Sequence, residues 1–287
     1  MSSGTTLVTD SKRPLPTQAL LLPAIEPRWL LLDADNTLFD TEGPANTVAC
    51  DVANQMLKTH GKKKVYAAEE YIARFASVPF RESVQQVALE NGIRLSEDAI
   101  QEWDREELQQ NIVAFRRKTE PAPGVHDAVK WMASKYDLMV VSSSHGDRLE
   151  ACFQAAGLDD LLPPQKRLSA VTSLETPAPK PDPAVVDFAI KQTGLAAHQH
   201  LGFEDSVTGA RTYQAANGGN GVPCVAYLGL VPASTLGVRL AKMIDHGVQF
   251  GFDEWRHVEE FLGALQDAHR PTLQQFSLKE RLEKLEG

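Results

Sequence analysis

The chain has 287 residues, of which 43% are hydrophobic and 23% charged, with 29 basic and 38 acidic side chains. The formal net charge of −9 and the lack of a broad basic segment argue against nucleic acid as a partner, because binding to a phosphate backbone requires a basic face. Three cysteines without a C-x-x-C pair argue against a disulfide framework or a zinc site and fit a reducing compartment. No apolar run reaches the roughly 18–20 residues of a membrane span. We therefore expect a cytoplasmic protein with no membrane partner.

The predicted elements begin after a segment rich in Ser, Thr and Pro, residues 1–26, which we expect to be a flexible tail. Beyond it, short apolar runs alternate with helical patterns, which predicts an α/β fold with a doubly wound parallel sheet covered by helices. The predicted strands are Trp29–Asp33, Leu138–Ser142, Leu168–Val171, His200–Glu204, Val222–Leu228 and a weaker one near Val248–Phe250. Helices of the same part are predicted at 125–135, 147–156, 183–193, 206–216 and 254–267.

The alternation is interrupted between about 44 and 118, where the pattern is helical and no convincing strand occurs. We expect helices at 44–59, 67–75, 81–91 and 96–117. Turn-prone stretches bracket the segment, which predicts an all-helical insert that can close over the sheet edge and exclude water. The alternative is a set of extra helices packed permanently on the sheet. The expected division is a core of residues 27–43 and 119–268, the insert 44–118, and a C-terminal helical extension, 269–287.

Two carboxylates, Asp33 and Asp35, directly follow the first predicted strand. Because strand side chains alternate between faces, residues two apart point the same way, toward the ligand crevice at the carboxyl end of an open α/β sheet. Carboxylates that close repel each other unless a cation or a proton intervenes. The pair therefore indicates a bound divalent metal, a nucleophile and a proton-transfer group, although the same pattern also occurs in loops and helix caps.

Hydroxyl groups and a lysine follow later strands. Ser142, Ser143 and Ser144 precede a predicted helix and can bind a phosphate through hydroxyls and backbone N–H groups, or serve as a helix N-cap. Lys180 precedes a proline, which favours an extended backbone and suits the presentation of an ammonium group to an anion. The alternative for Lys180 is a solvated surface lysine.

A second acidic pair, Glu204 and Asp205, ends another predicted strand. It complements Asp33 around a hard cation with oxygen ligands, or alternatively caps the next helix. Each feature is ambiguous by itself, but an acid pair, a hydroxyl, a lysine and a second acid pair follow strands in this order.

In this order and spacing the chain resembles the haloacid dehalogenase-like (HAD) superfamily. The motifs that carry the resemblance are Asp33-x-Asp35-x-Thr37, Ser142, Lys180 and Glu204-Asp205-Ser206. The resemblance covers about residues 27–265 and implies a Rossmann-like core with an inserted all-helical cap domain. It is closest to the small phosphatases and phosphomutases that act on phosphorylated sugars and similar metabolites. Asn36 stands where the family often has Gly, but Asn also tolerates a left-handed conformation.

The resemblance implies a role for each acid. Asp33 would attack phosphorus and form an aspartyl-phosphate, while Asp35 would protonate the leaving oxygen and then activate water. Mg²⁺ would bind the carboxylate of Asp33, the backbone carbonyl of Asp35 and Asp205. Glu204 would contact the ion directly or through water.

The substrate side is less defined by the sequence. Ser142, Ser143 and Lys180 would bind the phosphoryl oxygens, and Arg81 in the cap could reach a substrate hydroxyl or a second anion, or be an ordinary surface arginine. The resemblance implies a monomeric, magnesium-dependent phosphatase for a small phosphate ester. Alternatives are a phosphomutase of the β-phosphoglucomutase type, a phosphatase for a nucleotide or isoprenoid phosphate, and a non-catalytic binding protein.

Overall fold

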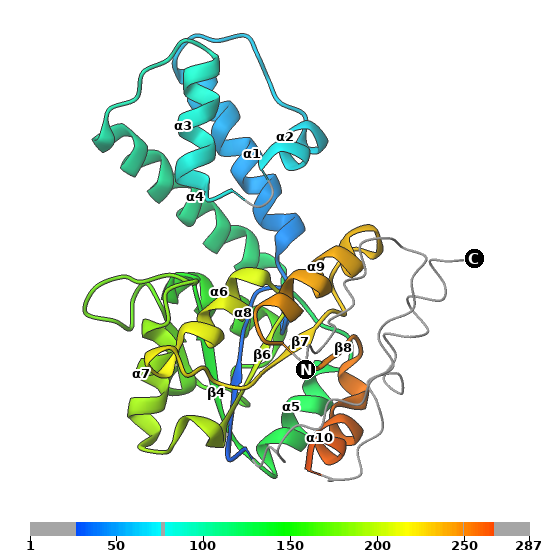
Figure 1. Cartoon of the computed structure of the whole chain (residues 1–287). Helices are drawn as coiled ribbons and strands as arrows, with labels where there is room; N and C mark the ends of the chain where they lie inside the picture. The colour runs from blue at the N-terminus through cyan, green and yellow to red at the C-terminus, as the bar shows by residue number, and fades with distance from the viewer. Residues whose placement is uncertain (1–26, 76–77, 249, 267–287) are drawn as a thin grey trace. The chain divides into compact units, whose positions relative to one another are not determined.

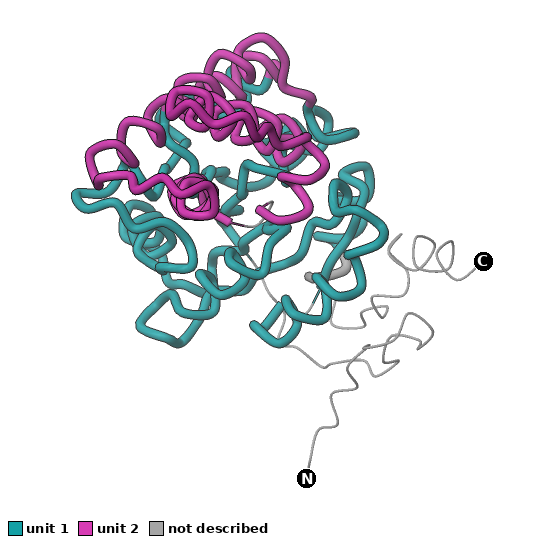
Figure 2. Tube along the Cα trace, turned by 90° about the horizontal axis from the view of Figure 1, so that it is seen from above, with its two compact units in different colours: residues 1–39, 121–146, 158–287 teal, residues 40–120, 147–157 magenta. Residues whose placement is uncertain are grey.

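The computed structural model describes residues 27–75, 78–248 and 250–266 (Figure 1). The predicted tail, 1–26, and the predicted C-terminal extension, 269–287, lie outside the described residues. The chain forms two compact units, shown in Figure 2: unit 1 consists of residues 1–39, 121–146 and 158–287, and unit 2 of residues 40–120 and 147–157. Within the described ranges, no helix combines the length and the apolar character needed to cross a bilayer.

Unit 1 is built around the predicted parallel sheet. Its strands are β1 (Trp29–Leu32), β4 (Asp137–Ser142), β5 (Arg167–Ser169), β6 (His200–Glu204), β7 (Cys224–Tyr227) and β8 (Phe250–Phe252), in the spatial order β5-β4-β1-β6-β7-β8. All neighbours are parallel, and Leu32 of β1 lies beside Val140 of β4 and Phe203 of β6. From β1 the chain first adds β4 and β5 on one side of the sheet and then β6, β7 and β8 on the other side. The direction in which strands are added therefore reverses next to β1. Ligands of open α/β sheets bind at such a switch point.

The helices of unit 1 are α5 (Val125–Ala133), α7 (Ala184–Thr193), α8 (Val207–Ala215), α9 (Ala233–Asp245) and α10 (Val258–Gln266) (Figure 1). Alternate strand residues point to opposite faces, and Leu31 of β1 belongs to a buried cluster that includes Val185 of α7, Tyr213 of α8 and Leu236 of α9. Helix α5 contacts β4 and α10. Because helices cover the sheet, the strands are almost entirely buried, as the continuous apolar runs indicated.

One helix of unit 1 and a separate two-stranded sheet were not predicted. Helix α9 was missed, although Leu236, Leu240 and Met243 form a buried stripe at helical spacing, because Gly237 in its middle weakens the helical signal. The short strands β2 (Phe39–Asp40) and β3 (Glu120–Pro121), which form a separate two-stranded sheet, carry too few residues for an alternating pattern.

Unit 2 contains the four predicted helices of the insert: α1 (Glu42–Thr59), α2 (Ala68–Phe75), α3 (Phe80–Glu90) and α4 (Glu97–Arg117). Their apolar faces form one buried cluster, with Met56, Tyr71 and Val87 among its members. Residues 147–157, most of helix α6 (Gly146–Ala156), also belong to this unit. The guanidinium group of Arg148 lies 5.0 Å from the centre of the Phe115 ring.

Candidate active site

Asp33 leaves the sheet at the carboxyl end of β1, and its backbone N–H still donates to the carbonyl of Phe203 in β6 at 2.9 Å. The chain then turns, with Asn36 in the left-handed conformation expected of it, at φ 54°. The hydroxyl of Thr37 donates to Oδ2 of Asp33 at 3.1 Å, and the indole N–H of Trp255 donates to the Thr37 carbonyl at 3.1 Å. Asp33 is 6% exposed, and these hydrogen bonds hold its carboxylate at the sheet edge.

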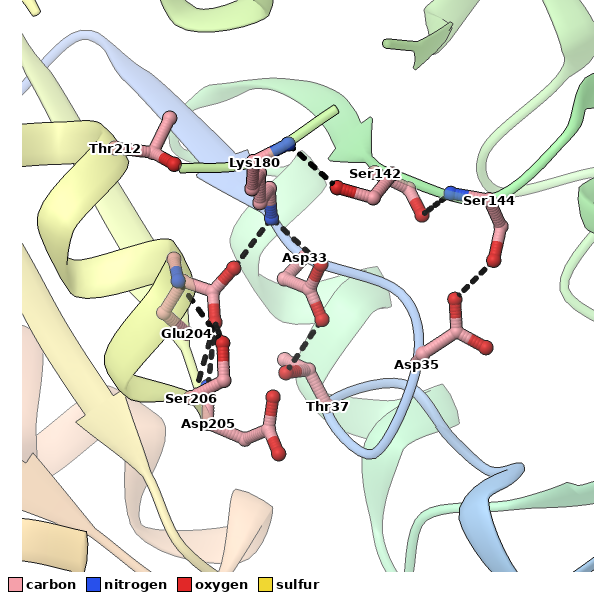
Figure 3. A network of polar contacts seen from close by, with 12 residues as sticks. Asp33, Asp35, Thr37, Ser142, Ser144, Lys180, Glu204, Asp205, Ser206 and Thr212 are labelled. Atoms are coloured by element: carbon pink, nitrogen blue, oxygen red, sulfur yellow. Dashed lines mark hydrogen bonds and ion pairs between the residues drawn. The ribbon is translucent and has the colours of Figure 1, made fainter. Parts of the chain in front are cut away.

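Lys180 is buried beside this carboxylate rather than solvated (Figure 3). Its Nζ donates to Oδ1 of Asp33 at 2.7 Å and forms an ion pair with Oε1 of Glu204. Its backbone N–H donates to the hydroxyl of Ser143 at 3.0 Å, and the peptide bond to Pro181 is cis. Lys180 therefore contacts Asp33 after β1 and Glu204 at the end of β6 through its side chain, and Ser143 after β4 through its backbone.

Three buried carboxylates come together at this edge. Asp33, Glu204 and Asp205 each offer one oxygen, and these oxygens lie within 4.8 Å of one another. The other oxygen of Glu204, Oε2, accepts from the backbone N–H groups of Asp205 and Ser206 and from the Ser206 hydroxyl, at 2.9–3.1 Å (Figure 3). Glu204 is thus fixed from one side while its Oε1 faces the lysine.

The electrostatics of the group follow from this crowding. Burial and the neighbouring charge of Glu204 raise the pKa of Asp33 to about 7, although Lys180 opposes the shift. Burial, then Glu204 and Asp33, also raise the pKa of Asp205 well above its ordinary value. Burial alone would lower the pKa of Lys180, but the carboxylates of Asp33 and Glu204 raise it well above its usual range.

These donors fit a hard divalent cation. Mg²⁺ binds oxygen ligands, and a buried cluster of Asp33, Glu204 and Asp205 supplies oxygens whose mutual repulsion a cation would relieve. The donor set contains no sulfur or nitrogen ligand that would favour a softer metal.

A basic residue that the sequence analysis missed contacts this group. Nη1 of Arg239, on α9, donates to Oδ2 of Asp205 at 3.1 Å. The guanidinium lowers the pKa of Asp205 against the effects of burial and of the neighbouring acids. No motif marks Arg239, and the helix that carries it was not predicted.

The second acid, Asp35, lies apart from the three carboxylates. Its Oδ2 accepts from the hydroxyl of Ser144 at 2.5 Å (Figure 3). The strand ends at Leu32, so the alternation that predicted a common direction for Asp33 and Asp35 does not extend to position 35. Asp35 is nevertheless close enough for its charge to raise the pKa of Asp33. A contribution of its backbone carbonyl to metal binding stays a prediction.

The other predicted substrate ligands occupy different surroundings. Ser142 is fully buried and its hydroxyl accepts from the backbone N–H of Ser144 at 3.0 Å. Arg81 belongs to α3 of unit 2, where its guanidinium forms an ion pair with Glu97. Phosphate binding by Ser142 and Ser143, and substrate binding by Arg81, stay predictions.

Comparison with known proteins agrees with the motifs. The model of the family described as haloacid dehalogenase-like hydrolase matches residues 30–219. A phosphoglycolate phosphatase from Pseudomonas fluorescens is 30% identical over 209 residues, which cover 71% of each protein.

Among solved structures, a HAD family hydrolase from Deinococcus radiodurans with bound phosphate and sodium has a TM-score of 0.59 at 19% identity, covering 84% of this chain and 97% of that one. CbbY from Rhodobacter sphaeroides, in complex with xylulose-(1,5)bisphosphate, has a TM-score of 0.54 at 16% identity, covering 70% and 86%. At these identities the likeness concerns the fold.

Proposed function

Since this chain belongs to the haloacid dehalogenase-like hydrolases and is a phosphatase, we propose that it hydrolyses a small phosphorylated metabolite with Mg²⁺ through an aspartyl-phosphate at Asp33. The observation that carries the proposal is the environment of the Asp33 carboxylate. Lys180 contacts one of its oxygens, Thr37 contacts the other, and the carboxylates of Glu204 and Asp205 lie within ligand distance.

In the first step an oxygen of Asp33 attacks phosphorus, and the bond from phosphorus to the ester oxygen breaks. Asp33 is positioned for this by the sheet and by Thr37, so little motion of the nucleophile is needed. The ammonium group of Lys180 would neutralise charge on the transferring phosphoryl oxygens, together with Ser142 and Ser143.

Asp35 has the protonation role in this proposal. It gives a proton to the departing ester oxygen, and it then takes a proton from the water that attacks the aspartyl-phosphate. Inorganic phosphate leaves and Asp33 is regenerated. A separate role for Asp35 is supported by its contact with the Ser144 hydroxyl and by its absence from the three acids whose oxygens lie within 4.8 Å of one another.

Asp33, Glu204 and Asp205 would hold the magnesium ion, with the backbone carbonyl of Asp35. When bound, the ion supplies positive charge that offsets the repulsion between a carboxylate nucleophile and a phosphate dianion. The raised pKa values of Asp33 and Asp205 support a cation requirement, because they reflect burial and repulsion between neighbouring carboxylates that a bound cation would offset.

The names of the relatives support a class of substrate. The curated relatives are named phosphoglycolate phosphatases, which supports a small, anionic phosphate monoester, with phosphoglycolate as the first compound to test. We also propose that the enzyme works as a monomer in the cytoplasm. Cys50, Cys152 and Cys224 are buried and form no disulfide with one another, which supports a reducing compartment.

The test is release of inorganic phosphate from phosphoglycolate, sugar phosphates, nucleoside monophosphates and an isoprenoid phosphate, each with Mg²⁺ and with EDTA. We expect turnover of at least one small ester with Mg²⁺, its loss in EDTA, and its loss in Asp33→Asn. Brief incubation with ³²P-labelled substrate and an acid quench should label the wild-type protein and leave Asp33→Asn unlabelled.

Other results would contradict the proposal. Phosphate release by Asp33→Asn at the wild-type rate would remove Asp33 as the nucleophile. Isomerised sugar phosphate without free phosphate would instead identify a mutase. Preference for the isoprenoid ester would contradict the proposed class of small metabolites. Full activity in EDTA would contradict the proposed requirement for Mg²⁺.

A further inference from the structure

We propose that Ser144 is a positioning residue that holds the acid–base group Asp35; this assignment rests on the proposed function. The hydroxyl of Ser144 donates to Oδ2 of Asp35 at 2.5 Å (Figure 3). Ser144 is the third of three consecutive serines and lies two positions beyond Ser142, which ends β4 and matches the family motif, so the motif does not assign Ser144 a role.

Asp35 needs such a support because it lies beyond the regular part of the sheet. Strand β1 ends at Leu32, so the ladder that fixes the backbone of Asp33 does not fix the side chain of Asp35. A general acid acts efficiently only when its proton lies within hydrogen-bond reach of the leaving oxygen. A side chain contributed by another loop can restrict the carboxyl group to one orientation.

Ser144 is itself tightly held. Its backbone N–H donates to the hydroxyl of Ser142 at 3.0 Å, and its carbonyl accepts from the hydroxyl of Ser169 at 2.7 Å. The Ser169 hydroxyl, at the end of β5, also accepts from the backbone N–H groups of Val171 and Thr172. Ser144, the partner of Asp35, is therefore held by Ser142 at the end of β4 and by Ser169 at the end of β5, and both of these serines are buried.

A hydroxyl suits both halves of the proposed reaction. It donates to the ionised carboxylate of Asp35, and after rotation it accepts from the protonated acid. The same contact is thus kept while Asp35 gives up a proton in the first step and regains one in the second. A backbone N–H or an ammonium group in this place could only donate and would favour the ionised carboxylate.

The leaving group of the substrate separates this role from phosphate binding. Transfer from an alkyl phosphate requires protonation of the departing oxygen, whereas p-nitrophenolate leaves without a proton. The value of kcat/KM reports steps up to the first irreversible one, so it isolates transfer to Asp33 from hydrolysis of the aspartyl-phosphate. A residue that acts through Asp35 should therefore matter for the alkyl ester and not for p-nitrophenyl phosphate.

The experiment compares wild type, Ser144→Ala, Ser144→Thr and Asp35→Asn on both esters, with the best alkyl phosphate of the substrate panel. We expect Ser144→Ala to lower kcat/KM for the alkyl ester about 10- to 100-fold, below the full contribution of a general acid, and to change it less than about 3-fold for p-nitrophenyl phosphate. Asp35→Asn should show the same selectivity with a larger loss. Ser144→Thr keeps a hydroxyl and should restore most of the activity.

An equal loss on both esters in a folded Ser144→Ala protein, judged by circular dichroism, would overturn the assignment in favour of phosphate binding. Unchanged activity on the alkyl ester would overturn it as well. If Ser144→Ala does not fold, Ser144→Thr and Ser144→Cys decide the question. A positioning role predicts that Ser144→Thr, which keeps a hydroxyl, stays active on the alkyl ester. It predicts that Ser144→Cys loses activity on the alkyl ester but not on p-nitrophenyl phosphate. A wild-type protein that cleaves neither ester overturns the proposed function itself.

Discussion

Gly209, in the first turn of α8, lies directly against the carboxyl group of Glu204. A methyl group at position 209 would overlap that carboxyl group. The backbone N–H of Gly209 donates to the hydroxyl of Ser206 at 3.0 Å, and this hydroxyl donates to Glu204 at 2.9 Å. The absence of a side chain at 209 therefore allows the helix to begin close to the acidic group.

Substitution Gly209→Ala should displace Glu204 and with it the ion pair to Lys180. We expect kcat to fall by about 10²-fold or more, the cost of losing one charged contact in a dry site, and the free energy of unfolding to fall by about 1–3 kcal/mol from overpacking. Phosphate-release kinetics and urea unfolding measure the two effects.

The matched control is Gly237→Ala in α9, where an added methyl group meets nothing within 4 Å. Alanine has the higher helix propensity, so this variant should be stabilised by about 0.5–1 kcal/mol with unchanged activity. If Gly209→Ala behaves like Gly237→Ala, the carboxyl group of Glu204 does not need its observed position.

The stability of the metal-free protein should depend on the ionisation of Asp33. The folded state raises its pKa from 3.8 to about 7, so the folded protein binds this proton more tightly than the unfolded chain. Its contribution to stability is therefore fully present below the unfolded pKa and is lost as the pH rises through the folded pKa. In EDTA, the stability of wild type relative to Asp33→Asn should fall between about pH 4 and 7, by at most about 1.4 kcal/mol per pH unit, and change little above this range.

Urea unfolding at several pH values in EDTA tests this dependence. Saturating Mg²⁺ should flatten it, because a metal binds the deprotonated carboxylates and replaces the protons. A difference between the two proteins that does not vary with pH would show that Asp33 ionises normally in the folded state.

Lys180→Met should remove the cation shared by Asp33 and Glu204. The pKa of Asp33 should then rise further, because Lys180 lowers it, and fewer molecules carry the ionised nucleophile at neutral pH. We expect a loss of about 10²–10³ in kcat at pH 7, measured by phosphate release. Lys191→Met, at an exposed position of α7, is the matched control and should keep wild-type activity. Similar rates for the two variants would contradict the role of Lys180.

Arg239→Gln should lower the stability of the metal-free protein. It removes a cation from a buried carboxylate, Asp205, which Glu204 and Asp33 already destabilise. The free energy of unfolding should fall by about 1–3 kcal/mol. The effect is limited because Arg239 is partly exposed and because Asp205 can take up a proton. Urea unfolding in EDTA measures it, with Arg211→Gln at an exposed position of α8 as the control.

Mg²⁺ should reduce the deficit of Arg239→Gln, because the ion supplies the missing positive charge. Restoration by the additional change Asp205→Asn would show that the cost comes from this pair. Equal stability of Arg239→Gln and Arg211→Gln would mean that the ion pair contributes nothing measurable.

The sequence contained enough information to place the strands of unit 1 and the residues at their carboxyl ends. Buried parallel strands are continuous apolar runs, and the polar residues that end them stand out, as Asp33 after Leu32 and Glu204 after Phe203 do. Since parallel strands place these ends at one edge, Asp33 and Glu204 could be expected to meet before any distance was known. Lys180 joins them from the segment between β5 and α7 rather than from a strand end.

Other parts of the site depended on contacts that no local pattern encodes. Arg239 reaches Asp205 from a helix that Gly237 obscured, and Trp255 supports the loop after β1 through one hydrogen bond. The alternation used to orient Asp35 does not reach it, because the strand ends at Leu32. Side-chain direction beyond the end of a strand is set by the turn and by its partners, here Ser144.

Strand β1 is synthesised first, yet it occupies the interior of the sheet, where Trp29 pairs with Asp137 on one side and His200 on the other. A chain growing on the ribosome therefore contains the proposed nucleophile, Asp33, long before the segments with Lys180, Glu204 and Asp205 have been synthesised. We expect any fragment that ends before β6 to be inert, because Glu204 and Asp205 have not yet joined the edge.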